Sequence, residues 1–287
     1  MPKYFKKSLY IFSGVIIFFV IAYSFYDRQF KLSNIKGEWP KVHFESLTKN
    51  QNSFLQTVFS QPFYYLDRGK QSFVFLSQDN RYVLKFFDSR CLRSGELPFL
   101  FPISEEHCSK KLEQLFEGYR VAQSFDRKNT GLLFVQLTPD PAYHIQASIF
   151  DRFGFRHQIN LEEVPFIIQE RAIPLRELIT KLLSKGKVKE AEQRLRQMIE
   201  MYVEEYRLGI VDLDHNFMYN TGFIGERPLR IDLGRLQFNE EIKDPAIYQQ
   251  DLKKVFIGRL SEWLERHFPK YRQEIMQTIN EEITSLD

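Results

Sequence analysis

The chain has 287 residues, of which 43% are hydrophobic and 27% are charged, and its net charge is +3. This length allows one large domain or two small ones, and the composition is ordinary for a globular protein. The small net charge and the lack of a basic run argue against nucleic acid as a partner. Only Cys91 and Cys108 could bind zinc through sulfur, and they lack metal-ligand spacing. Two unpaired thiols are the favoured interpretation, because a disulfide would need an oxidising compartment.

An uncharged apolar run, Leu9 to Phe25, lies near the N-terminus. A helix of about 20 residues crosses the hydrocarbon core of a bilayer. The run is longer than the apolar part of an ordinary signal peptide, so we expect residues 1–26 to form an uncleaved single-pass anchor. A cleaved signal peptide, with Ala22-Tyr23-Ser24 as a weak cleavage site, is the competing interpretation.

The side of the membrane on which the remaining chain lies is poorly determined by charge. Three lysines precede the apolar run and four basic residues follow it: Lys3, Lys6 and Lys7, then Arg28, Lys31, Lys36 and Lys41. The positive-inside rule therefore favours an external domain only slightly. The expected location is a bacterial inner membrane, with the side of the domain left open.

Strands predominate in the first half of the remaining chain. Residues 27–61 are polar and mixed, and we expect a juxtamembrane linker with a short helix near Phe54 to Phe59. Alternating and aromatic-rich segments then predict five strands: Phe63–Leu66, Ser72–Leu76, Arg81–Phe87, Gly131–Leu137 and Val164–Glu170. Apolar residues at helical spacing predict one helix over 104–125, and residues 144–159 resemble a hairpin.

Helices predominate after Pro174, with Leu175–Leu183 and Val188–Leu208 predicted first and two or more helices expected from Pro245 onwards. A loop-rich block separates these two groups. Such segregation of strands from helices predicts a two-lobed α+β protein. We expect an N-lobe over 62–171, with a five-stranded antiparallel sheet, and a helical C-lobe over 172–287.

Four features with chemical potential follow one another along the chain. Gly69 lies in a turn between two predicted strands, and Lys85 lies within the third strand. Asp214 and Asn220 follow a long helix, and Asp232 begins an Asp-Leu-Gly sequence after an apolar residue. Each feature alone is weak, because turn glycines, strand lysines and turn aspartates are common on protein surfaces.

Their order resembles that of the protein-kinase-like superfamily, including aminoglycoside-phosphotransferase-like and small bacterial kinase-like members. The resemblance implies that Gly69 covers the phosphates of ATP and that Lys85 holds them. It implies that Asp214 positions the acceptor hydroxyl and that Asn220 and Asp232 bind Mg²⁺. The backbone of residues 169–171 would hold the adenine. The anchor extends the resemblance to membrane-anchored proteins of Chlamydia-like bacteria.

The resemblance is incomplete, which leaves two functions open. The turn has one glycine where kinases have three, Asp212 takes the place of a histidine, and no activation segment ending in Ala-Pro-Glu is present. The glutamate partner of Lys85 would be Glu113 or Glu117, which are four residues apart on one helical face. The chain is therefore predicted to be an ATP- and Mg²⁺-dependent phosphotransferase with an undefined acceptor. The alternative is a catalytically inactive pseudokinase that acts as a membrane-tethered binding or scaffold module.

Overall fold

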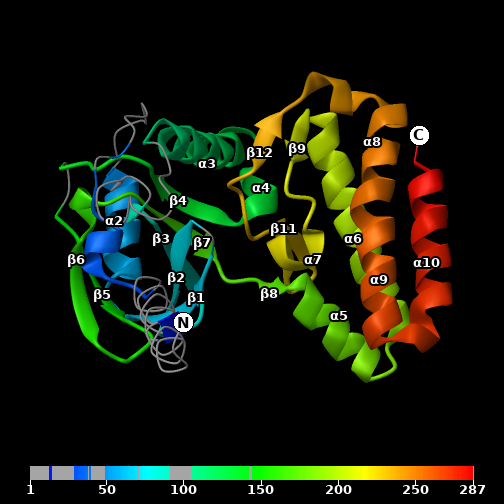
Figure 1. Cartoon of the computed structure of the whole chain (residues 1–287), viewed down its shortest axis with the longest axis horizontal. Coiled ribbons are helices and arrows are strands. Elements are labelled where there is room, and N and C mark those ends of the chain that lie inside the picture. The colour runs from blue at the N-terminus through cyan, green and yellow to red at the C-terminus, as the bar shows by residue number, and fades with distance from the viewer. Residues whose placement is uncertain are drawn as a thin grey trace, which may run out of the picture.

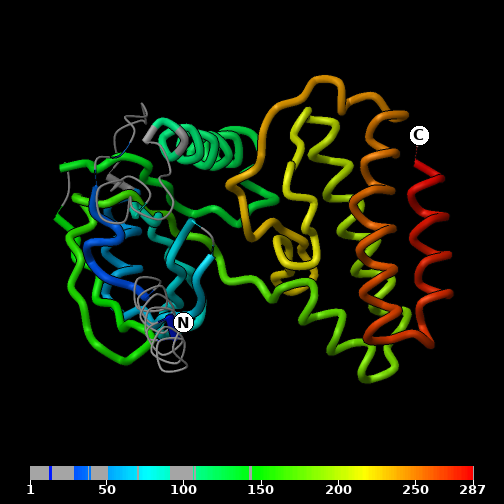
Figure 2. Tube along the Cα trace, viewed as in Figure 1, coloured from blue at the N-terminus to red at the C-terminus, as the bar shows by residue number. Residues whose placement is uncertain are grey.

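The structure is a computed structural model that describes residues 13–14, 29–37, 39, 49–69, 71–90, 105–141 and 144–286. Two lobes lie side by side, one built mainly from strands and one mainly from helices (Figure 1). The tube in Figure 2 follows the chain from the first lobe through residues 170–174 into the second. The predicted α+β class and two-lobed arrangement are therefore confirmed.

The N-lobe is built on a seven-stranded sheet with the order β4-β7-β3-β2-β1-β5-β6. Its strands are β1 Phe63–Arg68, β2 Ser72–Ser77, β3 Tyr82–Phe87, β4 Leu132–Gln136, β5 Gln146–Phe150, β6 Arg156–Asn160 and β7 Phe166–Glu170. The prediction of five antiparallel strands is wrong in two respects. The hairpin of β5 and β6 adds two strands, and β5 runs parallel to β1. Sequence patterns identified this hairpin but could not show that it pairs with the first strand.

Several short helices and one long helix accompany this sheet: η1 Leu32–Asn34, α2 Lys49–Val58, α3 Glu105–Phe125, α4 Arg127–Thr130 and η3 Leu161–Glu163. The bounds of α3 confirm the helix predicted over 104–125. Trp39 and Phe116 stack at the side of α3, with their ring centroids 6.0 Å apart. Phe116 also packs against Phe87 of β3, so aromatic contacts attach α3 to the N-lobe sheet.

Part of the segment predicted as a juxtamembrane linker packs into the N-lobe core. Phe30 lies edge-on to Phe73 and Phe75, with ring centroids 5.3 and 5.1 Å apart. Leu55 and Val58 of α2 are fully buried in the same cluster. These side chains are packed like those of a domain, so the described part of 27–61 contributes to the N-lobe. The boundaries at 26, 61 and 171 stay predictions.

The C-lobe is mainly helical and carries two small sheets. Its strands are β8 Ile173–Pro174, β9 Ile210–Asp212, β10 Thr221–Ile224, β11 Arg227–Arg230 and β12 Leu236–Phe238. Its helices are α5 Leu175–Ser184, α6 Val188–Arg207, α7 Phe217–Asn220, η4 Glu240–Lys243, α8 Pro245–Leu252, η5 Lys253–Ile257, α9 Gly258–His267 and α10 Pro269–Thr284. The apolar face of α6 is buried against α5, α10 and the helical segment α8–η5–α9. This packing confirms the predicted helices after Pro174.

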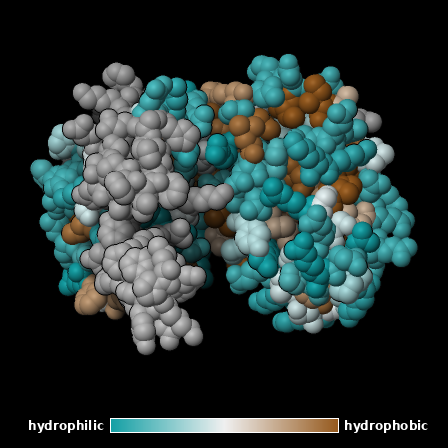
Figure 3. All heavy atoms as spheres, viewed as in Figure 1, coloured by the Kyte–Doolittle hydropathy of each residue, from teal (hydrophilic) through white to brown (hydrophobic). Residues whose placement is uncertain are grey.

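A third apolar cluster joins the two lobes. Leu115 and Phe116 of α3 pack with Ile210, Leu233 and Leu236 of the C-lobe. Figure 1 shows α3 reaching from the N-lobe to β12. Because these apolar side chains are buried against one another, separating the lobes near α3 would expose them to water at a cost in free energy. Figure 3 shows the lobes as two masses, with mostly hydrophilic atoms on the visible face of the C-lobe.

The predicted anchor, Leu9 to Phe25, lies outside the described residues except for positions 13 and 14. Within the described ranges, no helix is sufficiently long and apolar to cross a bilayer.

Candidate active site between the lobes

A cleft of about 660 Å³ lies between the lobes and collects most of the predicted site residues. Its lining residues come from the β1–β2 turn, the end of β3, helix α3, the loop after β9 and the segment after β11: Gly69, Gln71, Ser72, Asp88, Arg90, Lys111, Leu112, Leu115, Tyr119, Leu213, Asp214, Asn216, Asn220, Asp232, Gly234 and Arg235. The volume is within the range of small-molecule and cofactor sites. The cleft is therefore the candidate ligand site.

Asp214 and Asn220 are brought together by the loop that follows β9. The Asn220 side chain donates from Nδ2 to Oδ2 of Asp214 at 3.1 Å. The backbone N–H of Asp214 donates to Oδ1 of Asp212 at 2.9 Å, which fixes the start of the loop. The short helix α7 ends at Asn220 and places its side chain beside Asp214. The side chains of Asp214 and Asn220 thus lie side by side at the cleft.

Asp232 joins this pair through the backbone of Asn220. The carbonyl oxygen of Asn220 accepts hydrogen bonds from the N–H groups of Ile231, at 2.6 Å, and Asp232, at 3.2 Å. Oδ1 of Asp232 accepts from the Gly234 N–H at 3.2 Å, so the Asp-Leu-Gly sequence forms a turn. The three predicted residues Asp214, Asn220 and Asp232 therefore line one cleft and are linked by hydrogen bonds.

Lys85 reaches the same turn from the opposite lobe. Its side chain is 5% exposed, and Nζ donates to the carbonyl oxygen of Ile231 at 2.5 Å. Burial lowers the pKa of Lys85 from its ordinary value, and the Asp232 carboxylate partly offsets this effect. Lys85 is not among the residues that line the cleft. It contacts the residue that precedes Asp232. Its ammonium group has three N–H donors, and the Ile231 carbonyl accepts from one of them.

Gly69 lies at the rim of the cleft, in the turn from β1 to β2. Its N–H donates to the Ser72 carbonyl oxygen at 2.9 Å, which closes the turn. A side chain at this position would meet the Ser72 hydroxyl at 3.1 Å. Gly69 thus lines the cleft, and its contact with phosphates stays a prediction.

The two candidate partners of Lys85 on α3 are placed elsewhere. Glu113 accepts a hydrogen bond from Ser109, and Glu117 pairs with Arg120 at 2.6 Å. Neither glutamate forms an ion pair with Lys85 in the described part of the chain. The reason is the rotation of α3, which directs its apolar face towards the C-lobe and its glutamates outwards.

The face of α3 that does reach the site contains residues that sequence analysis missed. A Cβ atom on Gly118 would lie 2.2 Å from the carbonyl oxygen of Leu233, so only glycine allows this close approach. Tyr119, one residue later, is buried; burial and then the Asp232 carboxylate raise the pKa of its phenol well above the usual value. Its ring lies 5.3 Å from that of Phe87. A glycine within an otherwise regular helical pattern was the available signal for this contact.

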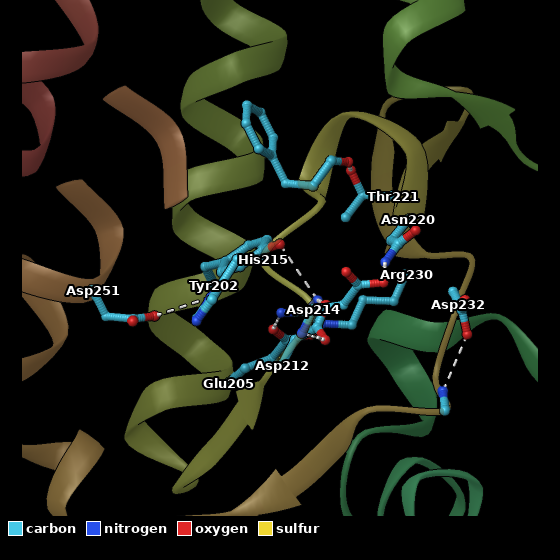
Figure 4. A network of polar contacts seen from close by, with 12 residues as sticks. Tyr202, Glu205, Asp212, Asp214, His215, Asn220, Thr221, Arg230, Asp232 and Asp251 are labelled. Carbon is cyan, nitrogen blue, oxygen red and sulfur yellow. Dashed lines mark hydrogen bonds and ion pairs between the residues drawn. The ribbon is translucent and has the colours of Figure 1, made fainter. Parts of the chain in front are cut away.

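A buried ionic cluster lies next to the loop that follows β9, and sequence analysis missed it too. Arg230 is 0% exposed and donates to both oxygens of Glu205, at 2.7 and 2.5 Å, and to Oδ2 of Asp212 at 2.8 Å. Its guanidinium also lies 4.2 Å from the centre of the Tyr202 ring. Figure 4 shows this cluster with Asp214 and Asn220 beside it.

The charges in this cluster alter one another's ionisation. Burial alone would lower the pKa of Arg230, but Glu205, Tyr202 and Asp212 reverse the effect and raise it well above the usual value. Asp212 binds both Arg230 and the Asp214 N–H, so it links the buried arginine to the loop after β9.

Asp126 extends the buried cluster towards the end of α3. Burial, together with the nearby carboxylate of Glu205, raises the pKa of Asp126 to about 9. Its Oδ1 accepts from the Asn129 amide at 2.9 Å. At neutral pH Asp126 is therefore a neutral acid beside the salt bridge of Arg230 and Glu205. The protein thus avoids burying a carboxylate that has no cation of its own.

The backbone of residues 169–171, which was predicted to hold adenine, forms hydrogen bonds within the protein. The N–H of Glu170 donates to the Gly131 carbonyl at 2.8 Å, and that of Arg171 donates to the Arg81 carbonyl at 3.0 Å. The buried amide of Gln169 binds the carbonyl oxygens of Thr130 and Arg230. The N–H groups of Glu170 and Arg171 are therefore used inside the protein, and binding of adenine by the backbone of 169–171 stays a prediction.

Clusters of metal ligands and cysteine thiols are the other features that could carry chemistry in the described residues. No group of three or more His, Cys, Asp or Glu side chains with metal-binding geometry occurs among the residues that the structure describes. Cys108 is a buried free thiol on α3, and Cys91 lies outside the described residues.

No protein-family model matches this chain, and no curated protein matches it. Solved structures do match. A crystal structure of WbdD, which another structure describes as a bifunctional kinase-methyltransferase, is 14% identical, with 79% of this chain and 47% of that chain covered and a TM-score of 0.39. This chain thus spans less than half the length of WbdD.

Two further matches cover most of both chains. Aminoglycoside phosphotransferase APH(2'')-Ib with ADP bound is 13% identical, with 81% of this chain and 86% of that chain covered and a TM-score of 0.27. WaaP in complex with acyl carrier protein is 13% identical, with 85% and 99% covered and a TM-score of 0.32. The predicted link to Chlamydia-like bacteria has no support in these matches.

Proposed function

We propose that this chain is a membrane-anchored phosphotransferase that uses ATP and Mg²⁺ and transfers a phosphoryl group to an acceptor hydroxyl. One observation carries the proposal. Asn220 joins Asp214 through its side chain and Asp232 through its backbone, and all three line one cleft. Lys85 reaches the same turn from the other lobe. This arrangement supports the proposal, because residues far apart in the sequence lie in or next to one cleft.

The residue types fit the proposed ligands. Mg²⁺ prefers oxygen ligands, and Asp232 and the amide oxygen of Asn220 provide them. Bound Mg²⁺ would neutralise charge on the phosphates during transfer. Asp214 would orient the acceptor hydroxyl and receive its proton. Lys85 would contribute a buried positive charge behind the phosphates, while Arg90 and Lys111 line the cleft wall.

One observation favours the second candidate, an inactive pseudokinase that acts as a membrane-tethered binding or scaffold module. Active kinases pair the strand lysine with a helix glutamate. Here Lys85 binds a backbone carbonyl, while Glu113 and Glu117 bind other side chains. A binding module would retain nucleotide affinity without turnover, and the two candidates can be separated by that difference.

The first test measures thermal unfolding of the full chain in detergent with and without Mg·ATP. Ligand at about 100 times its dissociation constant should stabilise the protein by about 2.7 kcal/mol. Asp232→Asn should abolish the stabilisation. Glu262→Gln, an exposed change on α9, is the matched control and should retain it. A wild-type protein without any Mg·ATP-dependent shift would overturn both candidates as nucleotide-binding proteins.

The second test separates catalysis from binding through Asp214→Asn. This variant should keep the Mg·ATP-dependent thermal shift, because Asp214 is assigned to the acceptor. It should lose ATP turnover by about 10² to 10⁴-fold, the usual contribution of a positioned acid or base. Equal turnover in wild type and Asp214→Asn, with binding intact in both, would favour the scaffold.

The anchor and its orientation belong to the same proposal. We propose that residues 1–26 hold the protein in a bacterial inner membrane. Since ATP is a cytoplasmic compound, an active enzyme requires a cytoplasmic domain, whereas the charge balance leans slightly outwards. Labelling of intact cells with a membrane-impermeant thiol reagent, with a cysteine added next to Asp287, reports the side. Protection supports the phosphotransferase, and labelling supports the scaffold.

A further inference from the structure

We infer that the turn of the β5–β6 hairpin is a second membrane contact, which inserts Phe153 and Phe155 into the lipid interface. The inference uses the proposed anchor but not the proposed catalysis. The turn lies at the outer end of the seven-stranded sheet, at the lower left of Figure 2.

The turn presents large apolar side chains to solvent in a fixed conformation. Phe153 is 62% exposed and Phe155 is 66% exposed, the two highest values among the large apolar side chains in the described part of the chain. Oδ1 of Asp151 accepts from the backbone N–H groups of both residues at 2.9 Å. Gly154 between them has a φ of +85°, which favours glycine. The exposure is thus built into an ordered turn.

Basic side chains flank the two phenyl rings. Arg152 and Arg156 are exposed on either side of the Phe-Gly-Phe sequence. Oδ2 of Asp151, the carboxylate of this turn, binds His157 at 2.9 Å. Aromatic rings with neighbouring arginines are typical of surfaces that lie in the headgroup region, where rings enter the acyl boundary and arginines meet anionic lipids.

The position of the predicted anchor indicates that a lipid bilayer, rather than a protein, covers this turn. The apolar run with its flanking residue ends at Tyr26, four residues before Phe30. Four residues span at most about 14 Å. Phe30 packs against His157 of β6, with ring centroids 5.4 Å apart. His157 is two residues from Phe155, so the short tether ends beside the strand that carries the turn.

Geometry and chemistry therefore agree. The anchor would hold the β6 side of the N-lobe against the membrane, where an exposed Phe-Gly-Phe turn with two arginines would otherwise lie in water. A second contact would also restrict rotation of the domain about its single tether and so fix the direction in which the cleft opens.

The test uses the full chain in vesicles of neutral lipid or of neutral plus anionic lipid, with acyl chains brominated near the headgroup. Phe153→Trp places an indole on the turn. Its emission should be blue-shifted and should lose intensity in brominated vesicles, more strongly with anionic lipid. Ile247→Trp on α8 of the C-lobe is the matched exposed control and should show no loss. The signal of Trp39 and Trp263 is measured in the parent protein and subtracted.

The charge component is tested by adding Arg152→Gln and Arg156→Gln to the Phe153→Trp protein. Each basic residue near an anionic surface contributes about fivefold to binding, so the anionic enhancement of quenching should disappear. Quenching no greater than that of Ile247→Trp would overturn the inference. A blue shift without bromine quenching would also overturn it, because protein rather than lipid would then cover the turn. Neither measurement involves nucleotide, so failure here leaves the proposed phosphotransferase untouched.

Discussion

The two lobes each contain a buried cation, and the two cations differ in their hydrogen-bond partners. Arg230 in the C-lobe is fully buried and donates to two carboxylates. Lys85 in the N-lobe is nearly as buried, yet its one hydrogen bond within the described residues goes to an uncharged carbonyl. Their pKa values move apart accordingly: that of Arg230 is raised, and that of Lys85 is lowered.

The difference separates a charge that is fully paired inside the protein from one that still has donors for a ligand. A buried ion whose donors are saturated by opposite charges fixes the surrounding loop. A buried ammonium with spare donors gains most from an added anion, such as a phosphate. Arg230 therefore holds Asp212 at the start of the loop after β9, whereas in the proposed site Lys85 would be where an anionic ligand binds most strongly.

The largest expected effect tests the structural half of this comparison. Arg230→Met leaves Glu205 and Asp212 buried without their cation, which should lower the free energy of unfolding by about 3–5 kcal/mol. Lys85→Met should cost about 1–3 kcal/mol, because it leaves only one carbonyl unsatisfied. Urea unfolding of the full chain in detergent measures both. Equal losses in the two variants would break the comparison.

The next effect concerns the pH dependence caused by Asp126. Its folded pKa of about 9 lies above its unfolded value, so the unfolded chain releases a proton that the folded chain keeps. The stability it contributes is complete below about pH 4 and is lost as the pH rises towards 9.

Asp126→Asn should remove this dependence, since the amide can still accept from Asn129 and can donate to Glu205. The variant should thus be more stable than wild type at about pH 8 and similar near pH 4. Urea midpoints across this range measure it, with Glu262→Gln as the control. A wild-type slope that persists in Asp126→Asn would show that another group causes it.

A smaller effect tests the packing that positions the Lys85 side of the cleft. Gly118→Ala would place a methyl group against the Leu233 carbonyl, and overpacking of this kind costs about 1–3 kcal/mol. It should also weaken the Mg·ATP-dependent thermal shift, because Leu233 follows Asp232. Gly258→Ala on α9 is the matched helical control, with open space around it, and should stabilise by up to about 1 kcal/mol. Identical behaviour of the two variants would exclude close packing as the reason for Gly118.

The smallest expected effect concerns the glutamates of α3. Glu113→Gln and Glu117→Gln should each change the free energy of unfolding by less than about 0.5 kcal/mol, as surface substitutions do. Neither should alter the Mg·ATP-dependent shift, because neither contacts Lys85. A lost shift in one of them would show that the helix turns towards Lys85 when nucleotide binds.

Sequence periodicity predicted α3 and the strands of the N-lobe closely, because apolar spacing reports directly on which face of an element is buried. It missed the pairing of β5 with β1, because contacts between distant strands leave no local pattern. It also missed the partnership of Arg230 with Glu205, which are 25 residues apart on different elements. Long-range ion pairs of this kind depend on how helices and strands pack.

The sequence by itself determined the order of Gly69, Lys85, Asp214, Asn220 and Asp232, because chemically distinctive residues can be recognised without their neighbours. It also determined the segregation of strands and helices and the apolar run at the N-terminus. Only the tertiary structure decided the partners of these residues: the rotation of α3 turns Gly118 towards Leu233 and Glu113 and Glu117 away. The physical reason is that apolar packing sets this rotation, and charged side chains then bind whatever lies within their reach.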